Sequence, residues 1–335
     1  MNARVGPAII DVEGTVLGSA DRARLRHPAA GGVILFSRNY QEPAQLRALV
    51  GEIRALRHEL LLCVDHEGGR VQRFRAGFTP LPAMRRVGVL WDRDRGAARA
   101  AARAAGVVIA AELAAYDVDF SFAPVLDLDY GTSAVIGDRA FHRDPLAVGE
   151  LAAAFIAGLG DCGMAAVGKH FPGHGYAAAD SHVDMPRDDR TLDEILGRDV
   201  APYRPAISAG LAAVMPAHVV YTRVDPLPAG YSSFWLQEVL RGRLGFDGLI
   251  FSDDLSMKGA TTAGSIAERA RMALGAGCDM VLLCNDPAGQ EELLDSLGGV
   301  TPLAERRFAR MRRAGSRGVA QRTYRQASAI VSRLA

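Results

Sequence analysis

Apolar residues gather in eight short runs along the chain, and longer stretches with a helical pattern separate them. Within each run nearly every residue is apolar, instead of every second one. This pattern is typical of a strand that is buried on both faces of a parallel sheet. The eight predicted strands are Ala8–Asp11, Gly32–Phe36, Leu60–Asp65, Val118–Phe122, Ala165–Gly168, Ala212–Met215, Leu249–Ser252 and Asp279–Leu283.

The stretches between these runs carry the signals of helices. The apolar residues of 46–53 fall on one helical face, and Asp144-Pro145 supplies a capping residue followed by a first-turn proline. Thr191 and Ser265 each stand three residues before a glutamate, which fits a capping box at the start of a helix. The alanine-rich stretch 97–115 also favours a long helix.

Strand and helix thus alternate eight times, which predicts an α/β fold consisting of a single (β/α)8 TIM-type barrel over residues 1–335. Residues 306–335 are rich in arginine and are expected to form C-terminal helices on the outside. The pattern alone leaves an open doubly wound sheet as an alternative. No Gly-x-Gly-x-x-Gly follows the first run and no Walker-type loop occurs, so the sequence lacks the usual signatures of nucleotide binding.

Composition narrows the classes of partner. Of the 335 residues, 49% are hydrophobic, and the formal net charge is only +1, so the chain has no overall basic field for nucleic acid or an anionic membrane surface. The first ten residues lack the sections of a signal peptide, and no apolar run approaches the roughly 20 residues of a membrane helix. The four scattered cysteines favour reduced thiols over a disulfide framework. We therefore expect a cytoplasmic monomer that binds neither nucleic acid nor membrane.

Polar residues stand directly after the predicted strands. In a (β/α)8 barrel these positions meet at the C-terminal end, where the active sites of such barrels lie. Carboxylates, arginines, histidines and a lysine on one face suit a ligand with many hydroxyl groups, because charged groups make the stronger hydrogen bonds. A glycosidase needs, in addition, a nucleophile and a proton donor flanking the scissile bond. The polar segments are 65–73, 124–129, 136–141, 169–175, 180–182, 215–218, 251–257 and 285–286.

Three of these segments together resemble glycoside hydrolase family 3. They are Lys169-His170-Phe171-Pro172-Gly173-His174-Gly175, Asp180-Ser181-His182 and Phe251-Ser252-Asp253-Asp254-Leu255-Ser256-Met257. Within the family, the chain is most similar to the single-domain bacterial β-N-acetylglucosaminidases, and the likeness extends from about Ile9 to Asn285. The resemblance implies a metal-independent enzyme that needs no cofactor.

The resemblance also implies a retaining double displacement, with Asp253, the aspartate directly after Ser252, as the nucleophile. Asp254 is the competitor, but adjacent residues on a strand point to opposite sides, so we expect only one of the two to face the pocket. The implied proton donor is His182 of the Asp-x-His motif, with Asp180 orienting its ring. Imidazole titrates near neutrality, so it can protonate the leaving oxygen and later accept a proton from water.

Further residues match family positions that hold the sugar, namely Asp65, Arg73, Arg139, Lys169 and His170, and Met215 and His218 resemble positions that line the same pocket. The implied partner is a small saccharide or muropeptide. The implied reaction removes terminal, non-reducing, β-linked N-acetylglucosamine from anhydro-N-acetylmuramic acid or its peptides, in peptidoglycan recycling.

Each residue also has a purely structural interpretation. Taken alone, Asp65 or Asp253 could cap the turn that follows its strand, and Arg73 or Arg139 could form surface ion pairs of little energetic weight. The occurrence of several motifs together favours the catalytic interpretation. A structural or supporting role is preferred for His174, Asp11, Asp127 and Asp129.

Other functions stay open at this stage. A phosphorylase would use phosphate in place of water, and a histidine acid/base lacks the negative charge that would repel phosphate. A sugar-binding barrel without catalysis is disfavoured by the joint presence of Asp253, Asp180 and His182. His170 and His174 have the spacing of zinc ligands on a helix, but the intervening Phe-Pro-Gly breaks a helix, so we expect no metal site.

Overall fold

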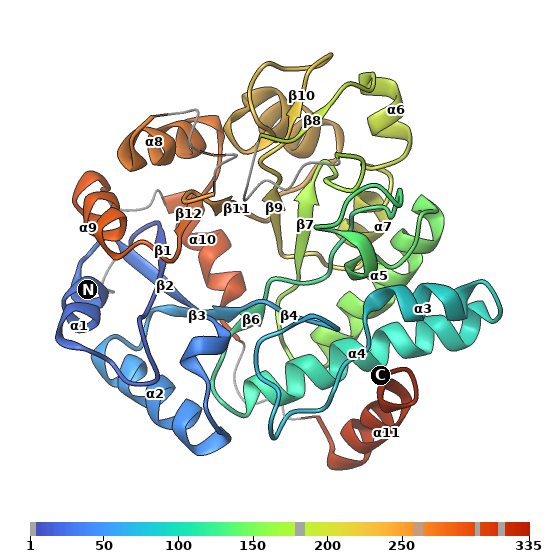
Figure 1. The fold of residues 1–335 in the computed structure, drawn as a ribbon, viewed down its shortest axis with the longest axis horizontal. Helices are drawn as coiled ribbons and strands as arrows, with labels where there is room; N and C mark the ends of the chain where they lie inside the picture. Colours follow the sequence, from blue (N-terminus) through green and yellow to red (C-terminus); the bar gives the residue numbers. More distant parts are fainter. Residues whose placement is uncertain (1–4, 178–184, 258–259, 261–263, 299–301, 314–318) are drawn as a thin grey trace.

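The structure is a computed structural model that describes residues 5–177, 185–257, 260, 264–298, 302–313 and 319–335. The described part is a ring of strands with helices around it (Figure 1). Asp180 and His182, for which catalytic roles are expected, lie outside the described residues.

Eight parallel strands form the ring, and each overlaps one of the eight predicted runs. Apart from β7, each strand pairs with its predecessor in the ring, and the last strand pairs with the first. A parallel bridge between Val125 and Lys169 closes the remaining gap between β6 and β7. The predicted barrel is therefore confirmed, and the open doubly wound sheet is excluded. The strands are β1 (Ala8–Asp11), β2 (Ala30–Leu35), β3 (Leu61–Val64), β6 (Phe120–Ser121), β7 (Val167–Phe171), β9 (Ala213–Pro216), β11 (Leu249–Asp254) and β12 (Met280–Leu283).

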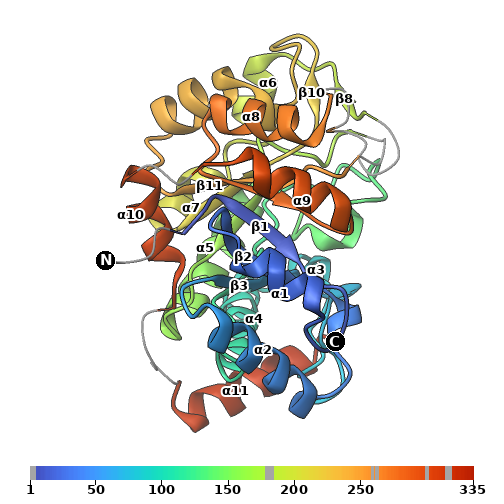
Figure 2. The same ribbon diagram turned by 90° about the vertical axis from the view of Figure 1, so that its left-hand side faces the viewer.

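The helices surround the ring, as Figures 1 and 2 show from two directions. The predicted capping boxes are present, because the side chains of Thr191 and Ser265 accept hydrogen bonds from the backbone N–H groups of Glu194 and Glu268. The helices are α1 (Ser19–Arg26), α2 (Pro43–Leu56), α3 (Met84–Trp91), α4 (Arg95–Ala114), α5 (Pro145–Asp161), α6 (Leu192–Gly197), α7 (Tyr203–Ser208), a π-helix (Phe234–Arg243), α8 (Ile266–Ala276), α9 (Pro287–Ser296), α10 (Pro302–Met311) and α11 (Gln321–Ser332).

Among the described residues, four short strands lie in the segments that connect the barrel strands. β4 (His66–Gly68) and β5 (Val71–Gln72) form an antiparallel pair directly after β3. β8 (Arg187–Asp188) and β10 (Val220–Tyr221) form a small parallel sheet. The first of these pairs carries part of the pocket described below.

Aromatic rings fill the interior of the barrel. Phe120, Phe122 and Phe251 are fully buried, with ring centroids 5.2 to 5.6 Å apart. Phe122 also borders the pocket, and the ammonium group of Lys169 lies 6.0 Å from the centre of its ring. The barrel interior is thus a packed apolar core that ends where the polar pocket begins.

Ion pairs tie neighbouring strands together at the N-terminal end of the barrel. Asp279, just before β12, accepts a hydrogen bond from the backbone N–H of Ile250 in β11 and pairs with Arg241 and with Arg307 of α10. Asp119, just before β6, accepts from the backbone N–H of Leu62 in β3. These carboxylates join adjacent strands at the end opposite the predicted site.

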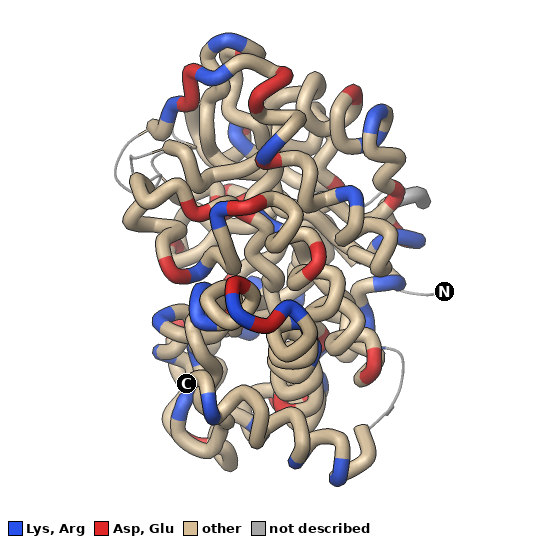
Figure 3. The backbone as a smooth tube through the Cα atoms, turned by 90° about the vertical axis from the view of Figure 1, so that its right-hand side faces the viewer, with Lys and Arg blue, Asp and Glu red and all other residues tan. Residues whose placement is uncertain are grey.

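The outer surface carries both signs of charge. Figure 3 shows acidic and basic residues interspersed along the backbone. α11 packs on the outside against α4, where the hydroxyl of Tyr324 donates a 2.7 Å hydrogen bond to Glu112. No helix among the described residues is long and apolar enough to cross a membrane.

Candidate active site

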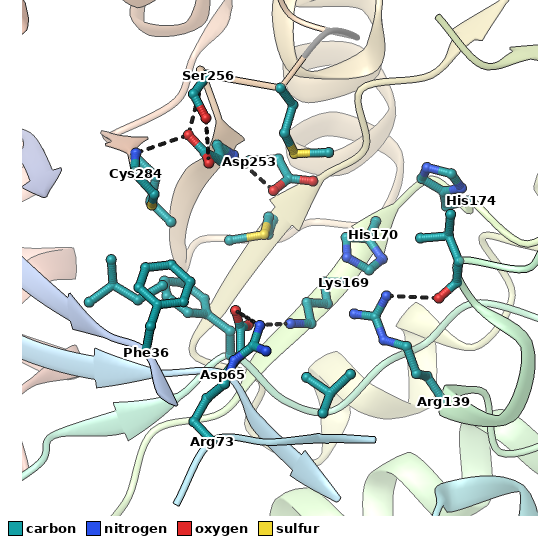
Figure 4. A pocket seen from close by; sticks show the side chains of 18 of the residues that line it. Phe36, Asp65, Arg73, Arg139, Lys169, His170, His174, Asp253, Ser256 and Cys284 are labelled. Carbon is teal, nitrogen blue, oxygen red and sulfur yellow. Dashed lines mark hydrogen bonds and ion pairs between the residues drawn. The ribbon is translucent and has the colours of Figure 1, made fainter. Parts of the chain in front are cut away.

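The predicted sugar-binding residues meet in a cavity of about 620 Å³ at the C-terminal ends of the barrel strands. Asp65, Arg73, Arg139, Lys169, His170 and Asp253 all border it (Figure 4). They come from β7, β11, the residues after β3 and the loop after β6, so segments far apart in sequence build one pocket. The remaining two predicted residues, Asp180 and His182, lie outside the described residues.

A cluster of alternating charges forms one side of the cavity. The Nζ atom of Lys169 lies 2.7 Å from Oδ1 of Asp65 and 2.6 Å from Oε1 of Glu67. Arg139 contacts Glu67 through Nη2 at 2.8 Å and Nε at 2.9 Å. Arg73 lies 3.4 Å from Asp65. We name these five residues the ion-pair cluster.

The cluster keeps its members charged despite their burial. Burial alone would raise the pKa of Asp65, but Lys169 and Arg73 outweigh it and bring that pKa below its ordinary value. For Glu67 the opposing effect of Arg139 and Lys169 is larger, so its pKa lies far below the usual range. Burial lowers the pKa of Lys169, but Asp65 and Glu67 raise it above its usual value. The cavity therefore presents fixed cations and anions to a polar ligand.

Glu67 joins two cations of the pocket, Lys169 and Arg139, and the sequence interpretation did not assign it a role. It has only 3% of its side chain exposed and contacts both Lys169 and Arg139. The available signal was its position two residues after Asp65, because Asp65 follows β3 directly and Glu67 lies in β4. The sequence did not indicate which cations it would meet, because Arg139 belongs to a distant loop.

Asp253 lies in β11 with its carboxylate at the cavity (Figure 4). Burial raises its pKa, but the nearby His218 and His170 outweigh that effect, and the pKa falls below its ordinary value. Its Oδ1 accepts a 2.8 Å hydrogen bond from the backbone N–H of Asp254. Asp253 is therefore an ionised carboxylate at neutral pH, as a nucleophile must be.

The neighbouring Asp254 is engaged in structural hydrogen bonds. Its Oδ1 accepts from the backbone N–H groups of Ser256 and Cys284 at 2.9 and 3.0 Å, and its Oδ2 from the Ser256 hydroxyl at 2.8 Å. Burial raises its pKa to about 6, although those hydrogen bonds act in the opposite direction. These contacts are of the kind expected for a structural role of Asp254, and the choice of Asp253 as the nucleophile stays a prediction.

One expectation about this pair is wrong. Asp253 and Asp254 both border the cavity, whereas the alternation of side chains along a strand predicted that only one would. The pairing of β11 with β12 shifts register between Phe251 and Asp254. Such an irregularity interrupts strict alternation, and it can bring consecutive side chains to the same side.

Histidines and a methionine complete the wall near Asp253. His170 and His174 border the cavity, and so does Met215, as expected. The Nδ1 atom of His170 lies 2.7 Å from Oδ2 of Asp127, a contact of the kind expected for a supporting aspartate. His218 is not among the residues that line the cavity; its Nε2 lies 3.1 Å from the backbone oxygen of Asp254.

Within the part of the chain that the structure describes, no group of three or more His, Cys, Asp or Glu side chains is placed to hold a metal ion. Asp180 and His182, which follow His170 and His174 closely in the sequence, lie outside that part.

The fold and the pocket define a barrel enzyme with an ionised carboxylate facing a polar cavity. The family model described as "Glycosyl hydrolase family 3 N terminal domain" matches residues 10–313. The chain belongs to glycosyl hydrolase family 3 and is a glycosidase, which confirms the resemblance seen in its motifs.

Curated relatives and solved structures agree with this assignment. A beta-hexosaminidase of Aromatoleum aromaticum is 60% identical over 293 residues, covering 87% of this chain and 82% of the relative. A beta-hexosaminidase of Nitrosospira multiformis is 60% identical over 310 residues, or 92% and 89% of the two chains. The crystal structure of NagZ from Neisseria gonorrhoeae in complex with N-trifluoroacetyl-D-glucosamine has a TM-score of 0.92 and 48% identity, covering 99% and 98% of the two chains.

Proposed function

We propose that this chain is a retaining β-N-acetylhexosaminidase that hydrolyses terminal, non-reducing β-linked N-acetylglucosamine. The observation that supports it most is that the ionised Asp253 borders the same cavity as the ion-pair cluster. Relatives named beta-hexosaminidase and a similar structure that holds an N-acylated glucosamine support the choice of sugar.

The proposed reaction proceeds through a covalent glycosyl-enzyme intermediate. Asp253 attacks the anomeric carbon while the glycosidic oxygen leaves with a proton from His182. In the second step water attacks the anomeric carbon, His182 accepts its proton, and the bond to Asp253 breaks. Asp180 orients the His182 ring throughout. For His182 and Asp180 the support is the Asp-x-His motif, since both lie outside the described residues.

The ion-pair cluster is proposed to hold the sugar ring. Lys169, Arg73 and Arg139 carry hydrogen-bond donors, whereas Asp65 accepts hydrogen bonds. A sugar hydroxyl can both donate and accept, so it can join a cation and a carboxylate that already face each other. Because Lys169 and Asp65 are fixed by their pairing at 2.7 Å, little side-chain freedom is lost when substrate binds.

The proposed natural substrate is N-acetylglucosamine linked to anhydro-N-acetylmuramic acid or its peptides, and the proposed setting is peptidoglycan recycling in the cytoplasm by a monomer of one domain. The support is the resemblance of the motifs and the composition of the chain. Figure 3 agrees with a partner other than nucleic acid, because positive charge is interspersed with negative charge.

Trapping with a 2-fluoro sugar analogue, in which fluorine replaces the acetamido group at C2, tests the covalent step. The expected result is one label per chain, located by peptide mass spectrometry on Asp253. A label on Asp254, or no label under conditions in which the analogue inactivates the enzyme, would overturn the assignment. Repeating turnover with added phosphate separates hydrolysis from phosphorolysis, because a glycosyl phosphate product would contradict hydrolysis.

A further inference from the structure

Asp127 is a buried carboxylate behind the cavity, and its three close contacts all lie in the segment that begins with β7. Its Oδ2 lies 2.7 Å from Nδ1 of His170 and accepts from the backbone N–H of His170 at 3.2 Å. Its Oδ1 accepts from the backbone N–H of His174 at 2.6 Å. The residue is 1% exposed and does not border the cavity itself.

The contact with Asp127 determines which nitrogen of His170 carries the proton. Burial raises the pKa of Asp127, but His170 and the hydrogen bonds outweigh it, so the pKa lies below its ordinary value and the group is ionised. An ionised carboxylate can only accept hydrogen bonds. The Nδ1 atom of His170 must therefore carry a hydrogen, and in the neutral ring Nε2 then holds a free electron pair.

His170 is placed to use that electron pair. It borders the cavity next to Lys169 in β7 (Figure 4). The neighbouring cations Lys169, Arg73 and Arg139 can only donate hydrogen bonds, so each sugar hydroxyl bound to them needs an acceptor for its own hydrogen. Asp65 is one such acceptor in the cavity, and Nε2 of His170 is a second. Such an acceptor recognises a hydroxyl but rejects a group that lacks the hydrogen.

We propose that Asp127 is a positioning residue that sets the direction of hydrogen bonding at His170, with Nδ1–H donated to Asp127 and Nε2 accepting from a hydroxyl of the sugar. This inference rests on the proposed role of His170 in sugar binding. The buried aspartate fixes the tautomer of His170, and that tautomer can accept a hydrogen bond only from a group that carries a hydrogen, such as a hydroxyl.

A purely structural role for Asp127 makes different predictions. Its bond to the His174 backbone also holds the turn after β7, so its loss could distort the cavity in a general way. General distortion weakens the binding of every sugar alike. Loss of a tautomer weakens only the binding of sugars that retain the hydroxyl that His170 recognises.

The first test reads the tautomer directly. Nitrogen-15 NMR of histidine-labelled enzyme, with the His170 signals assigned by their absence in His170→Gln, is recorded at a pH where the ring is neutral. A proton on Nδ1 is the expected result. A proton on Nε2 in the folded wild-type enzyme would overturn the inference without touching the proposed function.

The second test measures inhibition constants of N-acetylglucosamine and its 3-, 4- and 6-deoxyfluoro derivatives, since fluorine cannot donate a hydrogen bond. One derivative is expected to bind wild-type enzyme about 10-fold more weakly than the parent sugar. In Asp127→Asn the parent sugar should weaken about 10-fold and that derivative should hardly change. An equal loss for all four sugars would show a structural role and contradict the inference.

Asp129→Asn is the matched control. Asp129 lies two residues further on, accepts from the backbone N–H of Gly131 and lies 3.7 Å from Arg85. This variant is expected to bind all four sugars as the wild type does. If His170→Gln also binds them as the wild type does, the role of His170 in sugar binding fails, an outcome distinct from failure of the role of Asp127.

Discussion

Glu67 and Arg139 form a two-point ion pair, with Oε1 2.8 Å from Nη2 and Oε2 2.9 Å from Nε. The same carboxylate contacts Lys169 at 2.6 Å. One buried carboxylate thus contacts two cations that border the cavity. None of the sequence motifs had indicated this role for Glu67.

Replacing Glu67 with Gln is expected to reduce the free energy of unfolding by about 3 kcal/mol, because it leaves the buried Arg139 without its anion and leaves Lys169 with Asp65 alone. The Michaelis constant should rise about 10-fold or more, because Arg139 and Lys169 lose their fixed positions. Urea unfolding and kinetics on an aryl N-acetylglucosaminide measure both effects. Glu150→Gln is the control, since Glu150 pairs with Arg99 on the surface and its loss should cost less than about 1 kcal/mol.

Asp253→Ala should abolish turnover of an aryl N-acetylglucosaminide, with kcat reduced on the order of 10⁴-fold because no covalent intermediate can form. Asp254→Asn removes the negative charge of the carboxylate but keeps a polar side chain of the same size beside Ser256 and Cys284. A smaller reduction, about 10- to 100-fold, is expected from it. The assignment would be refuted if Asp253→Ala retained wild-type turnover, or if the order of the two effects were reversed.

The sequence predicted the strands well where the residues are apolar and less well where a strand enters the site. β7 was expected to end at Gly168, yet it continues through Lys169 and His170 to Phe171. The hydrophobic pattern stops at Lys169 because the residue is charged, whereas the strand continues because buried carboxylates neutralise that charge. β11 likewise extends beyond the predicted end at Ser252.

The motifs identified most residues of the candidate site, but they did not indicate which of those residues contact each other. Six of the eight predicted site residues meet in one cavity, and the other two lie outside the described residues. Pairings such as Glu67 with Arg139 could not be predicted, because they depend on how a hairpin and a distant loop approach each other. The shift of register between Phe251 and Asp254 is likewise a property of the pairing between β11 and β12, and the sequence does not reveal it.

His66 is expected to make the stability of the protein fall in mildly acidic solution. Its ring is fully buried beside Phe74 and Phe78, and burial lowers its pKa to about 3. Between the ordinary histidine value near pH 6.5 and about pH 3, the unfolded chain binds a proton that the folded chain does not. The contribution of His66 to stability is therefore complete above about pH 6.5 and declines by about 1.4 kcal/mol per pH unit as the pH falls through that window.

Urea unfolding of His66→Leu and wild type from pH 7 to pH 4 measures this effect. In the variant, the free energy of unfolding should fall with decreasing pH less steeply than in the wild type, by the slope that one proton contributes. His58→Leu serves as the control, because the His58 side chain is 84% exposed and should leave the slope unchanged. Parallel curves for His66→Leu and wild type would show that the ring is not held neutral by the fold.

Arg307→Met is expected to lower the free energy of unfolding by about 2 to 3 kcal/mol, since the side chain is 9% exposed and pairs with Asp279 at 2.9 Å. Its effect on kcat/KM should stay within about twofold, because the pair lies at the end of the barrel opposite the cavity. Arg310→Met, which removes a half-exposed partner of Asp247, should cost less than about 1 kcal/mol. A large loss of activity from Arg307→Met at a temperature where the variant is folded would contradict the separation of the two ends.

The four cysteines are expected to react slowly with thiol reagents in the folded protein. All are buried and free, and burial raises the pKa of Cys162 to about 11 and those of Cys63, Cys278 and Cys284 above their usual range. Because the thiolate is the reactive form, labelling at neutral pH should be slower on the order of 10³-fold than in urea. Rapid labelling of Cys284, which lines the cavity, would show that the pocket opens more widely than the structure indicates.

Asp119 and Asp279, whose carboxylates join adjacent strands, lie on the far side of the aromatic core from the cavity. Residues that stabilise the barrel and residues that line the cavity therefore occupy opposite ends of the same fold. Substitutions that strengthen the far end should raise heat resistance without disturbing the cavity, and this reserve of stability lets the loops around the cavity change during evolution without loss of the barrel.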